Sequence, residues 1–464
     1  MIASTASMRF AIGALLVLAP FHFVEVFTIT NSTAMAYMVV AGIMLRGSTL
    51  KLPLLGSMLL VLLGYLISTS QVDPSLYRLH GPALIMLVSG FIVFVLGYNL
   101  ARTVEDPRSV VNLVIVANLV VNAYCLIQLI VGPGLGASVL GFEAFSIEVN
   151  RGEGDPRLGG PFGGAPGILA QYLALVTLVI VYDAMHSDRG RRIKLWFLVA
   201  ANFGLIIATA NRGGFITLIV GVAGYLLMFR KELGTIRVIQ VAIAGFMVLA
   251  IISVLVIKLT DFNVMFERLE TVTETTEGGV PETRQAVWPQ AWERFKQVPW
   301  FGQGPMWQLP EERHGVPYPG RVFLEYPHSL YLYLLVSVGI VGTCAFAVYF
   351  LNLGMQLLRS TRAIRGRTGY LEGLVRLGPL ILFLFLLDQI RIEFLRQAFS
   401  DYQHVVFGLL GMWLGLAHRA VAVAEPVPTV ADDQSARRAS RRAPDTAGGL
   451  ARIGGTRSRT ISNR

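Results

Sequence analysis

The stretch EYPHSLYLYLLVSVGIVGTCAFAVYF, residues 325–350, lies where a long polar segment of the chain meets an apolar one. The polar segment covers residues 260–327, a length of 68 residues, and the chain on both sides of it is a succession of apolar stretches. A run of about 20 apolar residues can cross a bilayer as a helix. His328 is therefore predicted to lie at a boundary between membrane and water, where its ring can titrate near neutral pH.

The composition of the chain is that of a membrane protein. Of its 464 residues, 54% are hydrophobic and only 15% are charged, and the mean hydropathy is +0.60. Soluble domains carry about 25% charged residues, so a set of soluble domains is excluded. The formal net charge of +10 would suggest nucleic acid as a partner in a soluble protein. Here the basic residues collect in short loops between apolar stretches, so we expect membrane lipid and no nucleic acid as a partner.

We predict an all-α polytopic membrane protein with about twelve transmembrane helices and one large, partly helical loop. The predicted spans lie near 10–29, 33–45, 52–69, 81–100, 110–131, 166–182, 195–209, 215–229, 238–259, 329–351, 373–390 and 401–418. The second span and the pair around 195–229 are short, so we expect them to be tilted, broken or incomplete. The predicted divisions are 1–259 with nine helices, 260–328 as the loop with interfacial helices, 329–418 with three helices, and 419–464 as a disordered basic tail.

The basic residues of the short loops predict the orientation of the chain. One set of alternate loops holds fifteen arginines and lysines, and the opposite set holds six. Because cytoplasmic loops carry the excess of positive charge, we expect both termini in the cytoplasm and the long loop on the other side. The six are Arg78, Arg151, Arg157, Arg212, Arg391 and Arg396.

Two of these six arginines lie in glycine-rich segments. Arg212 belongs to the turn TANRGG at residues 209–214, whose glycines offer backbone freedom. Its planar guanidinium suits a diphosphate, although snorkelling towards lipid phosphate is an alternative. Arg157 belongs to a Gly- and Pro-dense stretch at residues 156–167. That stretch predicts either an irregular segment lining a cavity or a plain surface loop.

The long loop carries an aromatic helical pattern. Trp288, Trp292 and Phe295 are spaced i, i+4 and i+7, which predicts one helical face. Tryptophans at this level favour anchoring at the membrane interface, and Pro289 predicts a kink or the start of a second helix. Arg284 lies one turn before Trp288 and shares its side, either as a ligand or as a solvated residue.

His328 is the strongest candidate for catalysis, because an imidazole can accept a proton from a hydroxyl; capping of the following helix is the alternative. Asp388, Arg391 and Glu393 end the eleventh predicted span on the same side, where they suit either a site or ion pairs between helices. The loop lacks cysteine and a His-x-x-x-His pattern, so we expect no metal there.

Four motifs in this order resemble those of the O-antigen ligase-like superfamily of bacterial membrane glycosyltransferases. The similarity covers roughly residues 110–418. The motifs are RLGGPF at 157–162, TANRGG at 209–214, RQAVWPQAW at 284–292 followed by PWFGQG at 299–304, and HSLYL at 328–332 followed by Gly339 and Gly342. The chain departs from the family in Asn211, where serine is frequent, and in Ser329, where asparagine is usual.

The resemblance implies a GT-C-like glycosyltransferase without a cofactor or metal, in the bacterial inner membrane with its large loop in the periplasm. Such an enzyme moves a glycan from undecaprenyl diphosphate to an acceptor hydroxyl, in O-antigen ligation or surface polysaccharide polymerisation. Carried over by position, Arg212 and Arg284 would bind the diphosphate and His328 would act at the acceptor, while Arg157, Arg321 and Arg391 match less closely.

Two questions stay open at this level. A ligase would use lipid A core as the acceptor and a polymerase a second lipid-linked glycan, and the motifs do not separate them. The alternative from another class is a polytopic transporter, or a flippase of a lipid-linked glycan or small solute. It would place polar groups near mid-membrane and predict paired repeats.

Overall fold

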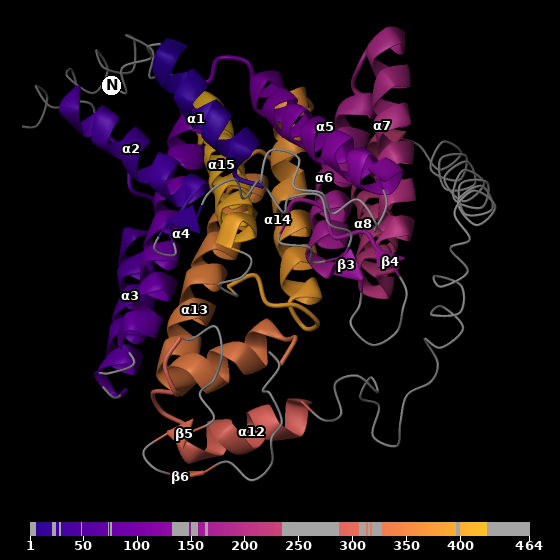
Figure 1. Ribbon diagram of the computed structural model, residues 1–464. Helices are drawn as coiled ribbons and strands as arrows, with labels where there is room; N and C mark the ends of the chain where they lie inside the picture. The colour runs from indigo at the N-terminus through magenta and orange to yellow at the C-terminus, as the bar shows by residue number, and fades with distance from the viewer. Residues whose placement is uncertain are drawn as a thin grey trace, which may run out of the picture. The chain divides into compact units, whose positions relative to one another are not determined.

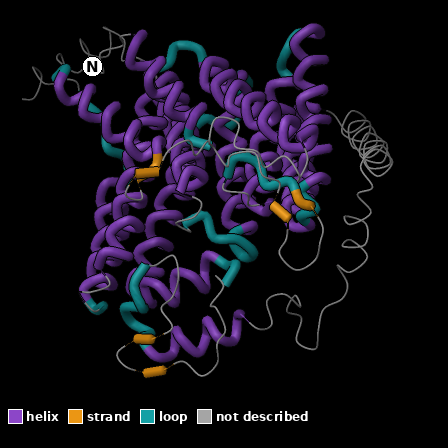
Figure 2. The backbone as a smooth tube through the Cα atoms, viewed as in Figure 1, coloured by secondary structure: helices purple, strands orange, loops and turns teal. Residues whose placement is uncertain are grey.

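The computed structural model describes residues 6–20, 25–26, 29–47, 49–72, 74, 77–131, 148–149, 156–162, 166–233, 287–305, 312–313, 316–317, 327–395 and 400–424. These residues are helical apart from connecting turns and three pairs of two-residue strands (Figure 2). Met1–Val421 form one compact unit, and a second unit begins at Ala422. Seven of the described helices are long and apolar enough to cross a membrane. The chain is therefore an all-α, multi-pass membrane protein.

The elements follow one another along the chain as labelled in Figure 1. The helices are α1 Ala6–Leu18, α2 Asn31–Leu45, α3 Leu55–Ser70, α4 Tyr77–Thr103, α5 Pro107–Val131, α6 Pro166–Met185, α7 Arg189–Ala208, α8 Arg212–Leu233, α12 Val287–Gln297, α13 Leu330–Ala363, α14 Tyr370–Asp388 and α15 Ser400–Ala424. The antiparallel strand pairs are β1 Glu25–Val26 with β2 Ile29–Thr30, β3 Glu148–Val149 with β4 Pro156–Arg157, and β5 Glu312–Arg313 with β6 Val316–Pro317.

Helix α6 is the most enclosed helix of the described unit. Every residue from Ile168 to Ala184 is buried, because α6 packs against α5, α7, α8 and α14. The approach of α8 depends on Gly214, where a Cβ would lie 2.3 Å from the Cβ of Ala170. Small residues let transmembrane helices come this close and increase their van der Waals contact. The start of α8 is therefore held directly against the start of α6.

Helix α13 is broken at Gly339, which has φ 65° and ψ −168°. Residues 299–305 fill the break and satisfy the backbone groups that it exposes. The four hydrogen bonds are Ile340 N–H to Pro299 O at 2.8 Å, Val341 N–H to Trp300 O at 3.1 Å, Gln303 N–H to Val336 O at 2.7 Å and Gly304 N–H to Ser337 O at 2.8 Å. A Cβ on Gly302 would lie 2.5 Å from Gly339 N, so these two backbones can meet only as glycines. The motif PWFGQG and Gly339 thus form one contact, and Figure 1 shows the first part of α13 lying crosswise to the rest.

The first predicted span, 10–29, is wrong in its second half. Helix α1 ends at Leu18, and Glu25–Val26 pair with Ile29–Thr30 as the strands β1 and β2. Pro20 has no N–H group with which to continue the helix, although the residues around it are apolar. A hydropathy profile detects the apolar run but not the end of the helix within it.

The sequence predicts that the two spans at 195–209 and 215–229 are short, and this prediction is also wrong. Helices α7 and α8 have 20 and 22 residues, because each includes a charged end that a hydropathy reading leaves out. Asp188 caps α7 by accepting a hydrogen bond from the N–H of Arg191 at 3.3 Å. The predicted span 238–259 lies outside the described residues, so the total of about twelve spans stays a prediction.

Helix α12 confirms a helix in the long loop but not a kink within the described residues. Pro289 lies in its first turn, where a missing N–H costs nothing. The buried face consists of Val287, Ala291 and Arg294, whereas Trp292 is 46% exposed. Trp288 and Phe295 are half-buried, so of the three aromatic residues Trp292 is the exposed one.

Candidate functional site

The sequence-predicted site residues are only partly described. Arg212 is the first residue of α8, His328 lies two residues before α13, and Arg391 lies three residues after α14. Arg157 is in β4, without a described side chain, and Arg284 and Arg321 lie outside the described residues. Residues 389–395, which we call the junction segment, connect the described members of this set.

The junction segment holds the start of α13. The N–H of Leu330 donates to the carbonyl oxygens of Gln389 at 2.9 Å and Ile392 at 3.2 Å. These bonds use a donor of the first turn of α13, which has no acceptor within the helix. His328 is therefore fixed close to the residues that follow α14. The starts of α6, α8 and α13 and the end of α14 mark one end of the helices. We call this end the site end.

Arg391 of the junction segment ties α14 to the start of α8. Its guanidinium forms a two-pronged ion pair with Asp388, through Nε to Oδ1 and through Nη2 to Oδ2 at 2.9 Å. Nη1 donates to Asn211 Oδ1 at 2.5 Å, and the hydroxyl of Thr217 donates to Asp388 Oδ1 at 2.9 Å. Planar pairing of this kind fixes both distance and direction. Arg391 thus orients the turn that carries Arg212.

The glycines of the turn serve close approach rather than unusual backbone angles. A Cβ on Gly213 would lie 1.8 Å from Nε of Arg391. The residue of the turn in the left-handed region is Ala210, with φ 47°. The expectation of backbone freedom at the glycines is therefore wrong for Gly213, whose missing side chain makes room for the arginine.

The start of α8 is capped and carries positive charge. Asn211 Oδ1 accepts a hydrogen bond from the N–H of Gly214 at 3.0 Å, so Asn211 caps the helix. Arg212 follows directly and is half-buried. The N-terminus of a 22-residue helix carries a partial positive charge, and the guanidinium of Arg212 adds a full one. Gly167 of α6 lies at the same point, since a Cβ there would be 3.2 Å from Asn211 Nδ2.

His328 has an uncommon backbone conformation, with φ 46°. A residue with a side chain holds that conformation when its surroundings impose it, at a cost of about 1–3 kcal/mol. Both flanks impose it here, because Trp288 Nε1 of α12 donates to Pro327 O at 2.8 Å and Leu330 is bound by the junction segment. The His328 side chain is 40% exposed, and its Nδ1 lies 4.0 Å from Oε1 of Glu393.

The motif around Arg157 packs inside the unit. Residues 158–162 are buried and non-helical, so the surface-loop alternative is wrong for them, and the lining of a cavity by this segment stays a prediction. The N–H of Leu158 donates to Ala208 O at 3.2 Å, and that of Gly160 to Gln128 Oε1 at 3.1 Å. The ring of Phe162 lies 5.2 Å from that of Tyr172 and 5.4 Å from that of Tyr402. This segment therefore joins the ends of α5 and α7 to α6 and α15.

Two polar clusters within the helices were missed by the sequence reading. Gln171 Oε1 accepts hydrogen bonds from Gln389 Nε2 of the junction segment and from the hydroxyl of Tyr402. Asn202 of α7 accepts from Asn118 at 2.9 Å and from Asn122 at 2.7 Å, and its Nδ2 donates to the hydroxyl of Thr177 at 3.0 Å. The available signal was the i, i+4 spacing of two asparagines in the apolar span at 110–131.

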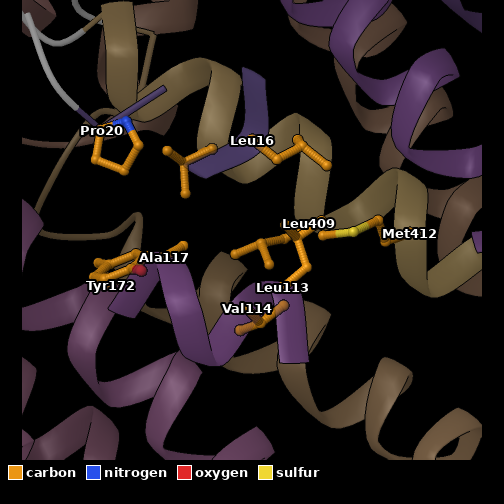
Figure 3. Close-up of a pocket in the computed structure, with 9 residues that line it drawn as sticks. Leu16, Pro20, Leu113, Val114, Ala117, Tyr172, Leu409 and Met412 are labelled. Atoms are coloured by element: carbon orange, nitrogen blue, oxygen red, sulfur yellow. The ribbon is translucent and has the colours of Figure 1, made fainter. Parts of the chain in front are cut away.

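An apolar pocket lies apart from these charged groups, between α1, α5, α6 and α15 (Figure 3). Its lining residues are Leu16, Pro20, Leu113, Val114, Ala117, Tyr172, Val405, Leu409 and Met412. The hydroxyl of Tyr172 is the one side-chain oxygen among these lining residues. Its lining residues offer no cation to a phosphate group.

Together these features define a multi-pass helical membrane protein with a basic, histidine-containing site at one end of its helices. Residues 197–347 match a family model described as O-antigen ligase. The match, over part of the chain, supports the resemblance of its four motifs to the O-antigen ligase-like superfamily of membrane proteins. The matched region contains Arg212, Arg284, Arg321 and His328 but neither Arg157 nor Arg391. No curated protein matches the chain.

Proposed function

We propose that the protein transfers a glycan from undecaprenyl diphosphate to an acceptor hydroxyl, in one displacement that inverts the anomeric configuration and needs no metal. The observation that carries this proposal is the arrangement at the site end. There the junction segment holds His328 and the turn of Arg212 in one region of the unit. The family match supports a lipid-linked glycan as the substrate class.

Arg212 would bind the diphosphate of the donor together with the start of α8. A departing diphosphate gains negative charge, and fixed cations and N–H groups aimed at that charge lower the barrier. Arg284 and Arg321 belong to the same family match and are proposed as further ligands. Arg157 is proposed on its motif alone. Arg391 is already paired with Asp388 and Asn211, so its contribution to binding includes holding Arg212 in place.

His328 would act as the general base. As the acceptor hydroxyl attacks the anomeric carbon, the imidazole takes its proton and the bond from carbon to the diphosphate oxygen breaks. The exposure of the His328 side chain, 40%, leaves it accessible to an acceptor. A positioned base of this kind contributes about 10²–10⁴-fold to the rate.

The proposal includes an orientation in the bacterial inner membrane. The excess of basic residues in one set of short loops supports cytoplasmic termini and a periplasmic long loop. The site end would then face the periplasm together with the long loop, and the basic tail would lie in the cytoplasm, although its first residues, up to Ala424, belong to α15 and are not disordered as predicted. The acceptor is lipid A core in a ligase and a second lipid-linked glycan in a polymerase.

A flippase or transporter is the second candidate, and the cluster of Asn118, Asn122 and Asn202 favours it. These side chains lie well inside α5 and α7, where a carrier places its polar groups. The cluster is uncharged, however, and the charged residues of the motifs lie at the site end. A flippase would move the lipid-linked glycan without making a new glycosidic bond.

A transfer assay tests the proposal. The purified protein is mixed with undecaprenyl-diphosphate glycan in the presence of a chelator, with lipid A core in one tube and no core in a second. Glycan on the core indicates a ligase, and lengthened lipid-linked glycan without core indicates a polymerase. The variant Glu232→Gln is the matched control, because its ion pair with Arg376 joins α8 to α14 away from the site end. Near-normal transfer by His328→Ala would contradict the proposal.

A further inference from the structure

We infer that Glu393 is a positioning residue for His328, which presents the histidine ring to the acceptor and stabilises its protonated form. This inference rests on the proposed function. Glu393 Oε1 lies 4.0 Å from His328 Nδ1. The carboxylate side chain is 2% exposed and the imidazole 40%, so the pair runs from the interior of the protein towards its surface.

The backbone that carries Glu393 is firmly held. The N–H of Phe394 donates to Gln389 Oε1 at 3.1 Å, and Leu330 N–H binds the carbonyl oxygens of Gln389 and Ile392. The ring of Phe394 is fully buried and lies 5.1 Å from that of Phe385. Because the same segment anchors the start of α13, the backbones that carry the carboxylate and the imidazole are held close to each other.

Burial of the Glu393 carboxylate costs free energy, which interactions with neighbouring groups must offset. Burying an ionised carboxylate is unfavourable unless it meets a positive charge or hydrogen-bond donors. Asp388, the neighbouring acid of the site end, is engaged by Arg391. Tyr333 of α13 also interacts electrostatically with Glu393. His328 is the residue near Glu393 that gains a positive charge during the proposed reaction.

The chemistry follows from the two ring nitrogens. An imidazole whose Nδ1–H points at Glu393 presents the lone pair of Nε2 to the acceptor. When the hydroxyl attacks, its proton moves to Nε2, its oxygen bonds to the anomeric carbon, and the diphosphate leaves with the electron pair of the broken bond. The carboxylate then lies beside an imidazolium and stabilises it. The separation of 4.0 Å exceeds a hydrogen bond, and such contacts tighten when substrates bind.

The test compares Glu393→Gln with Glu393→Asp and with His328→Ala in the full-length protein, with undecaprenyl-diphosphate glycan as the donor. We expect Glu393→Gln to lower kcat by about 10- to 100-fold and to change the KM for the donor by less than about twofold, because the side chain acts through His328. Glu393→Asp keeps the charge and should recover part of the rate. In the His328→Ala background, Glu393→Gln should cause no further loss.

Several outcomes would overturn the inference while leaving the proposed function intact. One is an unchanged kcat for Glu393→Gln when His328→Ala is inactive. Another is a further loss in the double variant, which would mean that Glu393 acts independently of His328. A third is that Glu393→Gln and Glu393→Asp lose kcat to the same extent and also lose melting temperature to the same extent, which indicates a structural role alone. Near-normal activity of His328→Ala would instead contradict the proposed function.

Discussion

The two ends of α6, α8 and α14 each hold a buried aspartate bound by an arginine, yet they differ in what surrounds the pair. At the far end, away from the site end, Asp183 accepts from Nε and Nη2 of Arg191 at 3.0 and 2.5 Å and from the Tyr370 hydroxyl at 2.8 Å. Arg108 lies over the Tyr370 ring, 4.9 Å from its centre. At the site end, the pair of Asp388 and Arg391 lies beside the turn of Arg212, and the same segment carries Glu393 near His328.

The difference shows that a buried aspartate–arginine ion pair can serve two purposes, joining helices alone or joining helices beside a proposed site. The far-end pair joins α6 and α14 to the start of α7, and its neighbours are aromatic rings and other hydrogen-bonding partners. The site-end pair also joins helices, but its neighbours are the residues of the family-like motifs, the turn of Arg212 and His328. A buried ion pair is therefore not evidence of a site by itself. The residues around an ion pair decide whether it belongs to a site. Substitutions in the two ion pairs should therefore separate effects on stability from effects on activity.

The largest effect is expected for the histidine at the site end. His328→Ala should lower the transfer rate by about 10²–10⁴-fold, because the base is lost while the proposed diphosphate site is kept. Arg212→Ala should be comparably slow through weaker stabilisation of the leaving group. The measurement is product formation by purified, correctly inserted protein. Transfer within twofold of the unchanged protein in either variant would remove that residue from the proposed site.

The next effect is expected from breaking each ion pair. Asp183→Asn and Asp388→Asn should each reduce stability by about 3–5 kcal/mol, since each leaves an arginine without its buried partner. Only Asp388→Asn should also slow the transfer catalysed by the protein that remains folded, by about tenfold or more, because it frees the arginine that orients the turn of Arg212. Thermal unfolding in detergent and initial rates at a temperature well below the transition measure the two quantities. Equal rates in the two variants would contradict the contrast between the ends.

A smaller effect is expected from adding one methyl group. Gly213→Ala places a Cβ within 1.8 Å of the present position of Arg391 Nε, so the arginine must move. We expect a loss of activity of about tenfold and a loss of stability of about 1–3 kcal/mol. Gly190→Ala is the matched control at the far end, where the nearest atom to the new Cβ is Asp188 Oδ2 at 3.5 Å. An active Gly213→Ala would show that Arg391 can move without cost.

The smallest effect is expected between the ends. Asn202→Ala removes one acceptor shared by Asn118 and Asn122 and one donor to Thr177. Hydrogen bonds between membrane helices contribute about 0.6–2 kcal/mol each, so the variant should unfold at a moderately lower temperature and keep its transfer rate. A selective loss of transfer or flipping in Asn202→Ala would favour the transporter alternative.

The sequence predicted the membrane class and several segments of the site, but it treated their glycines alike. Gly213 and Gly339 both stand in family-like motifs. Gly213 has helical neighbours and leaves room for an arginine that follows α14, whereas Gly339 has a positive φ and breaks its helix to receive residues 299–305. Both reasons depend on a partner far away in the chain, so neither can be read from local spacing.

What the sequence determined by itself is the order of apolar spans and polar segments, because burial in a membrane depends on the hydropathy of each stretch alone. It also marked the residue types suited to an anionic substrate, in Arg212, Arg391 and His328. Only the tertiary structure decided which of them meet. Asn211 and Arg391 are 180 residues apart in sequence, and the contact of His328 with Glu393 exists because α13 begins on the segment where α14 ends.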